Sequence, residues 1–393
     1  MTSTVYIAKN VYGGDGLGRL GDGRVIFVPG AWAGEQVKAE ITHEHKRFVN
    51  ARLVEVVEAS AERIDGGELK SIPGAVYANL GKEAELSAKA AQLAEFFERA
   101  RIRVNDLRLV ADGGFRNKVT YHFAKQRGEW VIGYRLEPSH ELIDIKHDPL
   151  AADAINAKLP EIRKNIITLL TTGPIAVRRE TERKERVTIR WTNKSGVKWW
   201  LGDASDSIIL KETTLGNDFE VPADGFYQVN PIVGEELVKS VVEAYRQGED
   251  AASNLLDLYC GVGVFGLCCK PAKLIGIESG RRAIDFAKRN AEAQRYANAR
   301  FYAEQVGRNL RRIPIGRNTT VIIDPPRGGL ESGVAKWLAN SNAPRIFYVS
   351  CDPATLMRDL REITTAYDVE AVKWFNMFPR TARFETFVQL RHK

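Results

Sequence analysis

The sequence predicts an α/β protein in three parts: a small β-barrel, a central α+β module and a doubly wound carboxyl-terminal domain. Three observations lead to this fold class. The first 58 residues hold only short β-rich runs between glycine turns, residues 59–225 mix strands with a few helices, and after residue 253 strand and helix patterns alternate. A length of 393 residues suits two or three domains. We place the boundaries after residues 58 and 225.

The amino-terminal segment predicts a small barrel of the OB-like kind, because several short strands follow one another in fewer than 60 residues. We expect strands over residues 4–8, 24–29, 36–42 and 50–57. Residues 13–19 are rich in glycine and are expected to form a flexible turn. Lys46 and Arg47 lie in a basic loop between two strands. Such a loop can hold nucleic acid, or it can be a solvated hairpin tip.

The central region predicts a module of strands and helices. A helix is expected over residues 78–102 and a second over 151–170, with strands at 118–123, 130–134, 187–191 and 198–201. The cations Arg116, Lys118, Arg190 and Lys194 are candidate phosphate contacts, although each can also be an ordinary surface cation. Phe226 and Gln228 then precede a helical pattern over 233–245. They can pack internally, or they can stack and hydrogen-bond a planar base.

The carboxyl-terminal domain predicts a seven-stranded, Rossmann-like sheet with helices on both faces. The expected strands cover residues 255–258, 273–277, 300–302, 320–323, 345–349, 369–375 and 386–390.

A glycine-rich turn follows the first of these strands. Gly261 and Gly263 would let the backbone approach a ligand, and Glu278 at the end of the next strand can accept both hydroxyls of a ribose. Two cofactors fit this pattern, a nicotinamide dinucleotide and S-adenosylmethionine. Asp257 before the glycines and the short distance from Gly263 to Glu278 favour S-adenosylmethionine. The alternative is that the glycines only turn the strand into a helix.

Reactive side chains follow other strands of the same sheet. Cys351 lies at the expected end of a buried strand, where open α/β sheets present reactive groups, although a free cysteine is often only a core residue. Asp324 and Arg327 follow the fourth strand and suit the polar edge of a base, or a plain surface turn. Glu385, before the last strand, can be a solvated acid or a base beside Cys351.

The overall composition adds weaker constraints. A net charge of +7 favours a polyanionic partner. The four cysteines form no C-x-x-C pair, so we expect neither a zinc site nor a disulfide framework. No apolar run reaches transmembrane length and the first residues do not read as a secretion signal, so we expect a cytoplasmic protein.

These motifs together resemble the tRNA and rRNA (uracil-5-)methyltransferases, and the resemblance runs through nearly the whole chain. An amino-terminal barrel similar to the TRAM domain of that family covers residues 1–58. The motifs FYQVN (226–230), DLYCGVG (257–263), DPPR (324–327), SCDP (350–353) and FPRTARFE (378–385) then follow in the family's order. Five ordered motifs are far more specific than any one of them.

The resemblance implies a role for each matching residue. It implies that Cys351 is the nucleophile and Glu385 the base. The cofactor contacts would be Gln228, Tyr259, Gly261, Gly263, Glu278, Gln305 and Asp324. The expected contacts to an RNA substrate are Phe226, Gln228, Asp324, Arg327, Arg116, Lys118, Lys46 and Arg47.

On chemical grounds alone, apart from the resemblance, methylation of uracil at carbon 5 accounts for a thiol and a carboxylate. Carbon 5 of uracil is a poor nucleophile until a thiolate adds to carbon 6 and turns the ring into an enolate. A base must later remove the proton on carbon 5 so that the cysteine can leave. Cytosine-5 RNA enzymes that use two cysteines would need one in the Asp-Pro-Pro motif, where this sequence has none.

The sequence also departs from the family pattern. Many relatives bind an iron-sulfur cluster through four cysteines, but residues 71–77 hold none and Asp148 occupies the later position, so we expect no cluster. Arg383 stands in place of a frequent histidine, and Val264 in place of a frequent asparagine. The expected activity is S-adenosylmethionine-dependent formation of 5-methyluridine in rRNA or tRNA by a monomer that needs no protein partner. The alternatives are an RNA cytosine-5 methyltransferase, a nicotinamide-dependent oxidoreductase and a non-catalytic RNA assembly factor.

Overall fold

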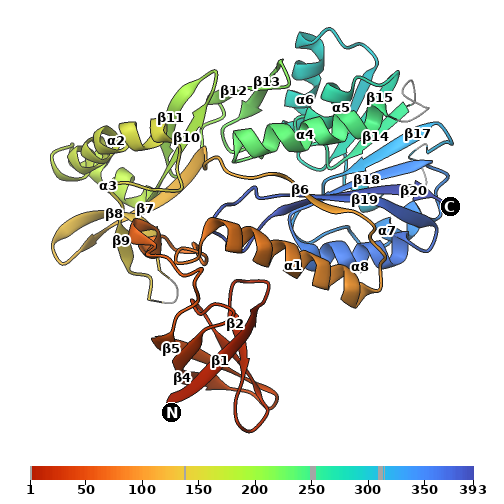
Figure 1. The fold of residues 1–393 in the computed structure, drawn as a ribbon. Helices are drawn as coiled ribbons and strands as arrows, with labels where there is room; N and C mark the ends of the chain where they lie inside the picture. Colours follow the sequence, from red (N-terminus) through yellow and green to blue (C-terminus); the bar gives the residue numbers. More distant parts are fainter. Residues whose placement is uncertain (1, 137–138, 248–253, 309–312, 314) are drawn as a thin grey trace. The chain divides into compact units, whose positions relative to one another are not determined.

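The computed structural model describes residues 2–136, 139–247, 254–308, 313 and 315–393. Internal contacts divide the chain into two units. One unit comprises Met1–Glu95 and Phe378–Arg383, and the other Phe96–Met377 and Phe384–Lys393. The first unit contains the amino-terminal barrel, and the second contains the central module and the large sheet (Figure 1). The expected boundaries after residues 58 and 225 stay predictions, because this division by contacts groups the chain differently.

The amino-terminal barrel is closed by five strands in the order β1-β2-β3-β5-β4. The strands are β1 (Thr2–Asn10), β2 (Gly16–Arg19), β3 (Val25–Val28), β4 (Gln36–Glu44) and β5 (Phe48–Glu58). Their side chains alternate between the barrel interior and its surface, so that Val5, Ile7, Ile26, Val37 and Val49 meet in one apolar core. The predicted barrel is confirmed.

One expectation for the barrel is wrong. Residues 16–19 are not part of a flexible turn, because they form strand β2. The glycines serve close packing here: a Cβ on Gly16 would lie 2.7 Å from the Ala31 carbonyl oxygen, and one on Gly18 would lie 2.5 Å from a Val5 methyl. Glycine is required at these positions because a neighbouring segment approaches the strand, and the turn itself is confined to the preceding residues.

Two helical segments follow the barrel. They are the short 3₁₀ helix η1 (Gly67–Ser71) and the long helix α1 (Lys82–Ala100). The long helix lies within the predicted range of 78–102.

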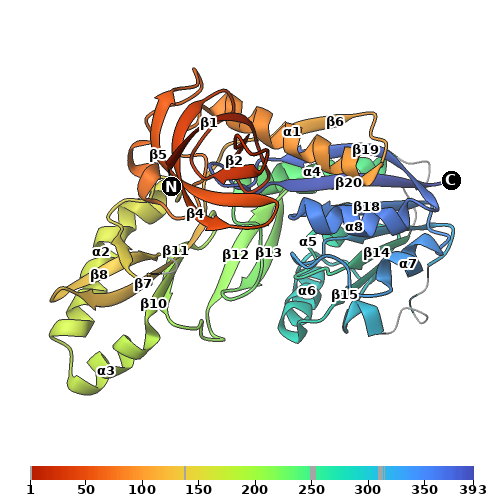
Figure 2. The same cartoon turned by 90° about the horizontal axis from the view of Figure 1, so that it is seen from below.

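The central module is built on a five-stranded antiparallel sheet in the order β11-β10-β7-β8-β9. Its strands are β7 (Lys118–Gln126), β8 (Glu129–Arg135), β9 (Leu142–Asp144), β10 (Arg186–Thr192) and β11 (Gly196–Leu201). Helices α2 (Asp153–Thr171) and α3 (Ile175–Lys184) lie beside this sheet (Figure 2). A separate hairpin follows, made of β12 (Ile209–Thr214) and β13 (Asn217–Pro222). The sequence did not predict α3 or this pairing.

The large sheet contains all seven predicted strands and one more. Its order is β16-β15-β14-β17-β18-β20-β19-β6, with β20 antiparallel to both of its neighbours. The strands are β14 (Asn254–Leu258), β15 (Lys273–Glu278), β16 (Ala299–Ala303), β17 (Thr319–Ile323), β18 (Arg345–Ser350), β19 (Tyr367–Phe375), β20 (Glu385–His392) and β6 (Leu107–Ala111). The eighth strand, β6, comes from a segment assigned to the central module and pairs in parallel with β19.

Helices cover both faces of this sheet, which explains why β17 and β18 are buried along their whole length. Figure 1 shows α4, α5 and α6 on one face and α7 and α8 on the other. The helices are α4 (Pro231–Arg246), α5 (Val264–Cys269), α6 (Arg281–Ala293), α7 (Val334–Ala339) and α8 (Pro353–Ile363), with the 3₁₀ turn η2 (Val306–Arg308). No helix in the described part of the chain is long and apolar enough to cross a membrane.

Candidate active site

Strand register brings Cys351 and Glu385 to the same edge of the large sheet. Strand β18 runs toward this edge and ends at Ser350, directly before Cys351, whereas β20 begins there with Glu385. The last antiparallel pair between the two strands is Ser350 with Thr386. Continuing that register by one residue sets Cys351 opposite Glu385. The thiol is partly exposed and the carboxyl is buried, with 4% of Glu385 accessible.

The turn after β18 is fixed by the start of helix α8. Asp352 is the N-cap of that helix, and its Oδ1 accepts hydrogen bonds from the backbone N–H groups of Ala354 and Thr355 at 3.0 and 3.1 Å. The Ser350 hydroxyl donates to the Asp352 carbonyl oxygen at 3.1 Å. Cys351 therefore lies between a buried strand and a capped helix, which restricts the positions its sulfur can take.

The surroundings of Cys351 and Glu385 disfavour negative charge on both. Burial raises the pKa of the Cys351 thiol to about 12, and the negative charges of Glu385 and Asp324 add to this effect. Burial also raises the pKa of Glu385 well above its ordinary value, again with a contribution from Asp324. Arg327 opposes both shifts with its positive charge. Near neutral pH the free protein therefore holds Cys351 as a neutral thiol, and burial disfavours the ionised form of the Glu385 carboxyl.

Two further carboxyl groups end neighbouring strands at this edge. Asp324 follows β17, and burial raises its pKa to about 7, with a contribution from the charge of Asp257. Asp257 lies in β14, is fully buried, and accepts the Gly266 N–H at 3.0 Å through Oδ2. Burial raises its pKa to about 7 as well. The site is thus a cluster of acids that a positively charged group would stabilise.

The glycine-rich turn after β14 has the backbone shape expected of a close approach to a ligand. Tyr259, Gly261 and Gly263 have φ angles of 61°, 52° and 88°, in the left-handed region that favours glycine. A Cβ added to Gly261 would meet no heavy atom within 4 Å, so the space beside this residue is open. A tyrosine held in this conformation is unusual and is a feature of functional sites.

Two cavities lie along this edge of the sheet. One, of about 60 Å³, is lined by Gln228, Tyr259, Gly261 and Asp324 among others. The other, of about 530 Å³, is lined by Ser279 and Gln305 among others and follows the carboxyl ends of β15 and β16. Most of the predicted cofactor residues line one or the other of these two cavities.

Glu278 ends β15 next to the second cavity. Its carboxyl accepts hydrogen bonds from the Gly280 N–H at 2.7 Å and from the Ser279 hydroxyl at 3.0 Å. Its backbone carbonyl accepts the Glu304 N–H at 2.9 Å, which holds the segment containing Gln305 beside it. Gln305 itself is exposed.

The segment that carries Phe226 and Gln228 is anchored at its end. Asn230 caps helix α4 by accepting the Val233 N–H at 3.3 Å, and it donates to the Gly113 and Met377 carbonyl oxygens at 2.8 and 3.2 Å. Gln228 packs against Gly234 of that helix, where an added Cβ would lie 2.8 Å from the Gln228 Cβ. Phe226 is 69% exposed, as a stacking surface would require.

The predicted basic contacts have different settings. Lys46 and Arg47 are exposed in the loop between β4 and β5, in the barrel unit. Arg116 and Lys118 are partly buried in the central module, and burial lowers the pKa of Lys118. Arg190 cannot contact a phosphate as we expected, because it is 1% exposed and pairs with Glu212 at 3.2 Å. Strand β10 is buried on both faces from Val187 to Arg190, which the sequence alone did not reveal.

Sequence reasoning missed one residue of the site, Glu212. It lies in β12, is 2% exposed and lines the 60 Å³ cavity together with Gln228 and Asp324. Burial raises its pKa to about 7. No motif marks this glutamate, and the only available signal was an acid flanked by the strand-forming residues of the 209–214 run.

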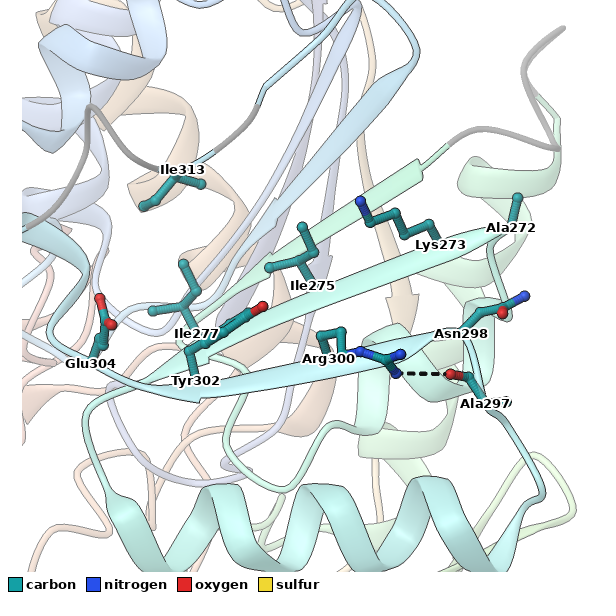
Figure 3. A pocket seen from close by; sticks show the side chains of 10 residues that line it. All are labelled: Ala272, Lys273, Ile275, Ile277, Ala297, Asn298, Arg300, Tyr302, Glu304 and Ile313. Atoms are coloured by element: carbon teal, nitrogen blue, oxygen red, sulfur yellow. Dashed lines mark hydrogen bonds between the residues drawn. The ribbon is translucent and has the colours of Figure 1, made fainter.

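Two other features stand apart from the predicted residues. A larger cavity of about 830 Å³ lies over β15 and β16, where Figure 3 shows Ile275, Ile277, Arg300 and Tyr302 among its lining side chains. It contains none of the predicted site residues. Within the described residues, no group of three or more histidine, cysteine, aspartate or glutamate side chains is arranged to hold a metal ion.

Comparison with known proteins agrees with this geometry. Residues 215–393 match the profile of the tRNA (Uracil-5-)-methyltransferase family, and residues 2–54 match the TRAM domain. An RNA methyltransferase of Thermotoga maritima, described as uncharacterized, is 28% identical over 99% of both chains. A similarly described RNA methyltransferase of Thermosynechococcus vestitus is 27% identical, covering 96% of this chain and 95% of its own.

A solved structure shares the fold of almost the entire chain. It is the Pyrococcus abyssi tRNA (uracil-54, C5)-methyltransferase in complex with S-adenosyl-L-homocysteine. The TM-score is 0.75 and the identity 22%, and the match covers 98% of this chain and 100% of that one. The doubly wound sheet with its glycine turn is therefore a methyltransferase fold. Residues 215–393 form a tRNA (Uracil-5-)-methyltransferase family domain, and residues 2–54 form a TRAM domain.

Proposed function

We propose that this protein transfers a methyl group from S-adenosylmethionine to carbon 5 of a uridine in rRNA or tRNA. The observation that carries the proposal is the register of β18 and β20, which sets a thiol opposite a carboxyl at the edge where the glycine turn lies. A nucleophile that activates the ring and a base that removes a ring proton are the two groups that this reaction needs.

The residues present fit S-adenosylmethionine. Glu278 is in position to accept ribose hydroxyls, Gly261 leaves open space beside the turn, and the acids Asp257, Asp324 and Glu385 suit a positively charged sulfur. When bound, S-adenosylmethionine supplies a methyl group on a sulfonium, which is an electrophile. A cationic partner of this kind also favours the ionised forms of the nearby acids.

The chain's own groups then carry out the remaining steps. The Cys351 thiolate adds to carbon 6 of the uracil, and the electron pair of the 5,6 double bond makes carbon 5 the nucleophile that takes the methyl group. The Glu385 carboxylate accepts the proton from carbon 5. The double bond re-forms as the bond between carbon 6 and sulfur breaks, which returns the thiolate.

Arg327 assists the two ionisations. It is exposed after β17, and its positive charge lowers the pKa of both Cys351 and Glu385 against the effect of burial. Because burial disfavours both anions, they form more readily when Arg327 is close to them.

The RNA would contact basic and aromatic groups of both units. Lys46 and Arg47 present positive charge from a barrel loop, and Arg116 and Lys118 do so from the central module. The exposed ring of Phe226 offers a face for stacking an unpaired base, because the target uridine must leave its helix to reach the thiol.

The direct test is to incubate the protein with total RNA from cells that lack it and with methyl-labelled S-adenosylmethionine. We expect label in 5-methyluridine and none after Cys351→Ala. Cys268→Ala, which removes a buried cysteine of helix α5, serves as the control and should retain activity. Label on a cytidine, or full activity of Cys351→Ala, would contradict the proposal.

A further inference from the structure

A buried polar cluster adjoins the small cavity at the glycine turn. Oε1 of Glu212 accepts hydrogen bonds from Arg190 Nη2 at 3.2 Å and from Asn117 Nδ2 at 3.4 Å. Arg190 and Asn117 are each 1% exposed, and Glu212 is 2% exposed. The three residues come from β10, the start of β7 and β12, so the cluster joins the central module to the hairpin beside the cofactor turn.

This cluster has unused hydrogen-bonding capacity. Both bonds to Glu212 end on Oε1, and within the described residues its Oε2 accepts none. Asn117 Oδ1 and Arg190 Nε are buried and likewise have no partner in the described part of the chain. Of these three residues only Glu212 lines the cavity, so its Oε2 is the atom that a ligand in the cavity can reach. Buried polar atoms are normally paired, and a carboxylate oxygen without a partner indicates a ligand with a cationic donor.

The position of the cavity identifies which part of the cofactor it faces. The expected ribose acceptor Glu278 and the cavity of about 530 Å³ lie at the ends of β15 and β16. This cavity shares no lining residue with the cavity of about 60 Å³ that Glu212 lines. The glycine turn after β14 lines the cavity of Glu212, and β14 neighbours β15 in the sheet, so this cavity lies next to the adenosine side. A volume of about 60 Å³ is far too small for an adenosine, yet it exceeds the ~10–15 Å³ that one water needs.

We propose that Glu212 binds the α-ammonium group of the methionine part of S-adenosylmethionine, with Arg190 and Asn117 positioning the Glu212 carboxyl through their bonds to Oε1. This inference rests on the proposed function. The amino acid head carries an ammonium donor, which matches the Glu212 carboxyl oxygen that has no partner in the described part of the chain. Burial raises the pKa of Glu212 to about 7, so the single contact with Arg190 does not keep it fully ionised, and a second cation would.

The test compares two ligands on matched variants. S-adenosylhomocysteine carries the amino acid head, whereas 5′-methylthioadenosine lacks it. For Glu212→Gln we expect the Kd of S-adenosylhomocysteine, measured by isothermal titration, to rise about tenfold or more, with the Kd of 5′-methylthioadenosine unchanged. Glu235→Gln is the control, because Glu235 lines the same cavity but is exposed and accepts the Leu215 N–H. It should leave both constants unchanged.

Each other outcome has a defined meaning. If Glu212→Gln weakened both ligands equally, or neither, Glu212 would be a structural residue and the inference would be overturned. If the unaltered protein bound neither ligand, the proposed function itself would fail. A further measurement uses the unaltered protein, so misfolding of a variant cannot affect it. Deamino-S-adenosylhomocysteine should bind at least about tenfold more weakly than S-adenosylhomocysteine. Equal affinities would refute the inference.

Discussion

At the scale of single residues, Cys351 is a nucleophile that its surroundings hold in the neutral form. Burial and the acids Glu385 and Asp324 raise its pKa to about 12. At pH 8 this leaves about a thousandfold less thiolate than an ordinary cysteine has, since each unit of pKa is a factor of ten. Reactivity in the free protein should therefore be low, and it should rise wherever a positive charge joins the cluster.

This ionisation state gives a pH prediction. Alkylation of Cys351 by iodoacetamide, followed on its peptide by mass spectrometry, should accelerate about tenfold per pH unit up to pH 10, because the thiolate fraction grows with pH below the pKa. Arg327→Met should slow the reaction at every pH, because Arg327 lowers that pKa. Arg361→Met, an exposed arginine in α8, is the control. A rate that levels off near pH 8.5 would contradict the assigned ionisation state.

Single residues also show which features of the site can be predicted from the sequence and which cannot. The identity of Cys351, Asp324 and Glu385 as candidates followed from their motifs at strand ends. Their protonation did not, because it depends on burial and on neighbours from three different strands. Arg190 was misjudged for the same reason: a cation in a β-rich run can face either way, and only the pairing of β10 fixes its direction.

At the scale of elements, helix α4 positions the cofactor segment through one glycine. Gly234→Ala would bring a Cβ within 2.8 Å of the Gln228 Cβ, which two packed carbon atoms cannot tolerate. We expect Gln228 to shift and the Kd of S-adenosylhomocysteine to rise at least severalfold, while the helix loses little stability because alanine favours it by ~1 kcal/mol.

The control for this prediction is Glu236→Ala on the same helix. Its side chain contacts Lys239 at 3.3 Å and does not line the cavity, so cofactor affinity should not change. Unchanged affinity for Gly234→Ala, measured by titration together with the thermal unfolding midpoint, would mean that Gln228 is not held by this contact.

Elements defined by local pattern were predictable, and those defined by distant pairing were not. The continuous apolar runs that form β17 and β18 indicated inner strands of a parallel sheet, and both strands are buried along their whole length. Strand β6 carries no comparable signal, and it joins the sheet only through pairing with β19, more than 260 residues later in the chain. Hairpin β12–β13 is different, because its strands pair locally across a two-residue turn that was not recognised in the sequence, and Glu212 was missed with it.

At the scale of the whole molecule, the proposed function assigns RNA binding to the barrel and chemistry to the large sheet, so the two should be separable by mutation. Lys46 and Arg47 are exposed cations of the barrel loop. Replacing both with glutamine should weaken RNA binding at low salt and reduce the slope of log K against log salt by about 1.4–1.8, since each phosphate contact contributes ~0.7–0.9. The Kd of S-adenosylhomocysteine should be unaffected.

A matched pair of substitutions in the same unit controls for loss of charge. Lys9 and Lys38 form ion pairs with Glu95 and Glu55 at 2.6 and 2.7 Å, so replacing both with glutamine should change the slope little. Filter binding across a salt series measures both double variants. Equal slopes for the two would show that the barrel loop makes no specific phosphate contact.

The central claim is that Cys351 bonds to the target uracil and Glu385 releases it. Peptide mass spectrometry of Glu385→Gln tests this most directly, after incubation with substrate RNA and S-adenosylmethionine and digestion of the protein and the RNA. We predict a methylated uridine nucleotide attached to the peptide that contains residue 351, and no attachment in the double variant that also carries Cys351→Ala. Free methylated RNA with no adduct, or an adduct on another peptide, would contradict the account.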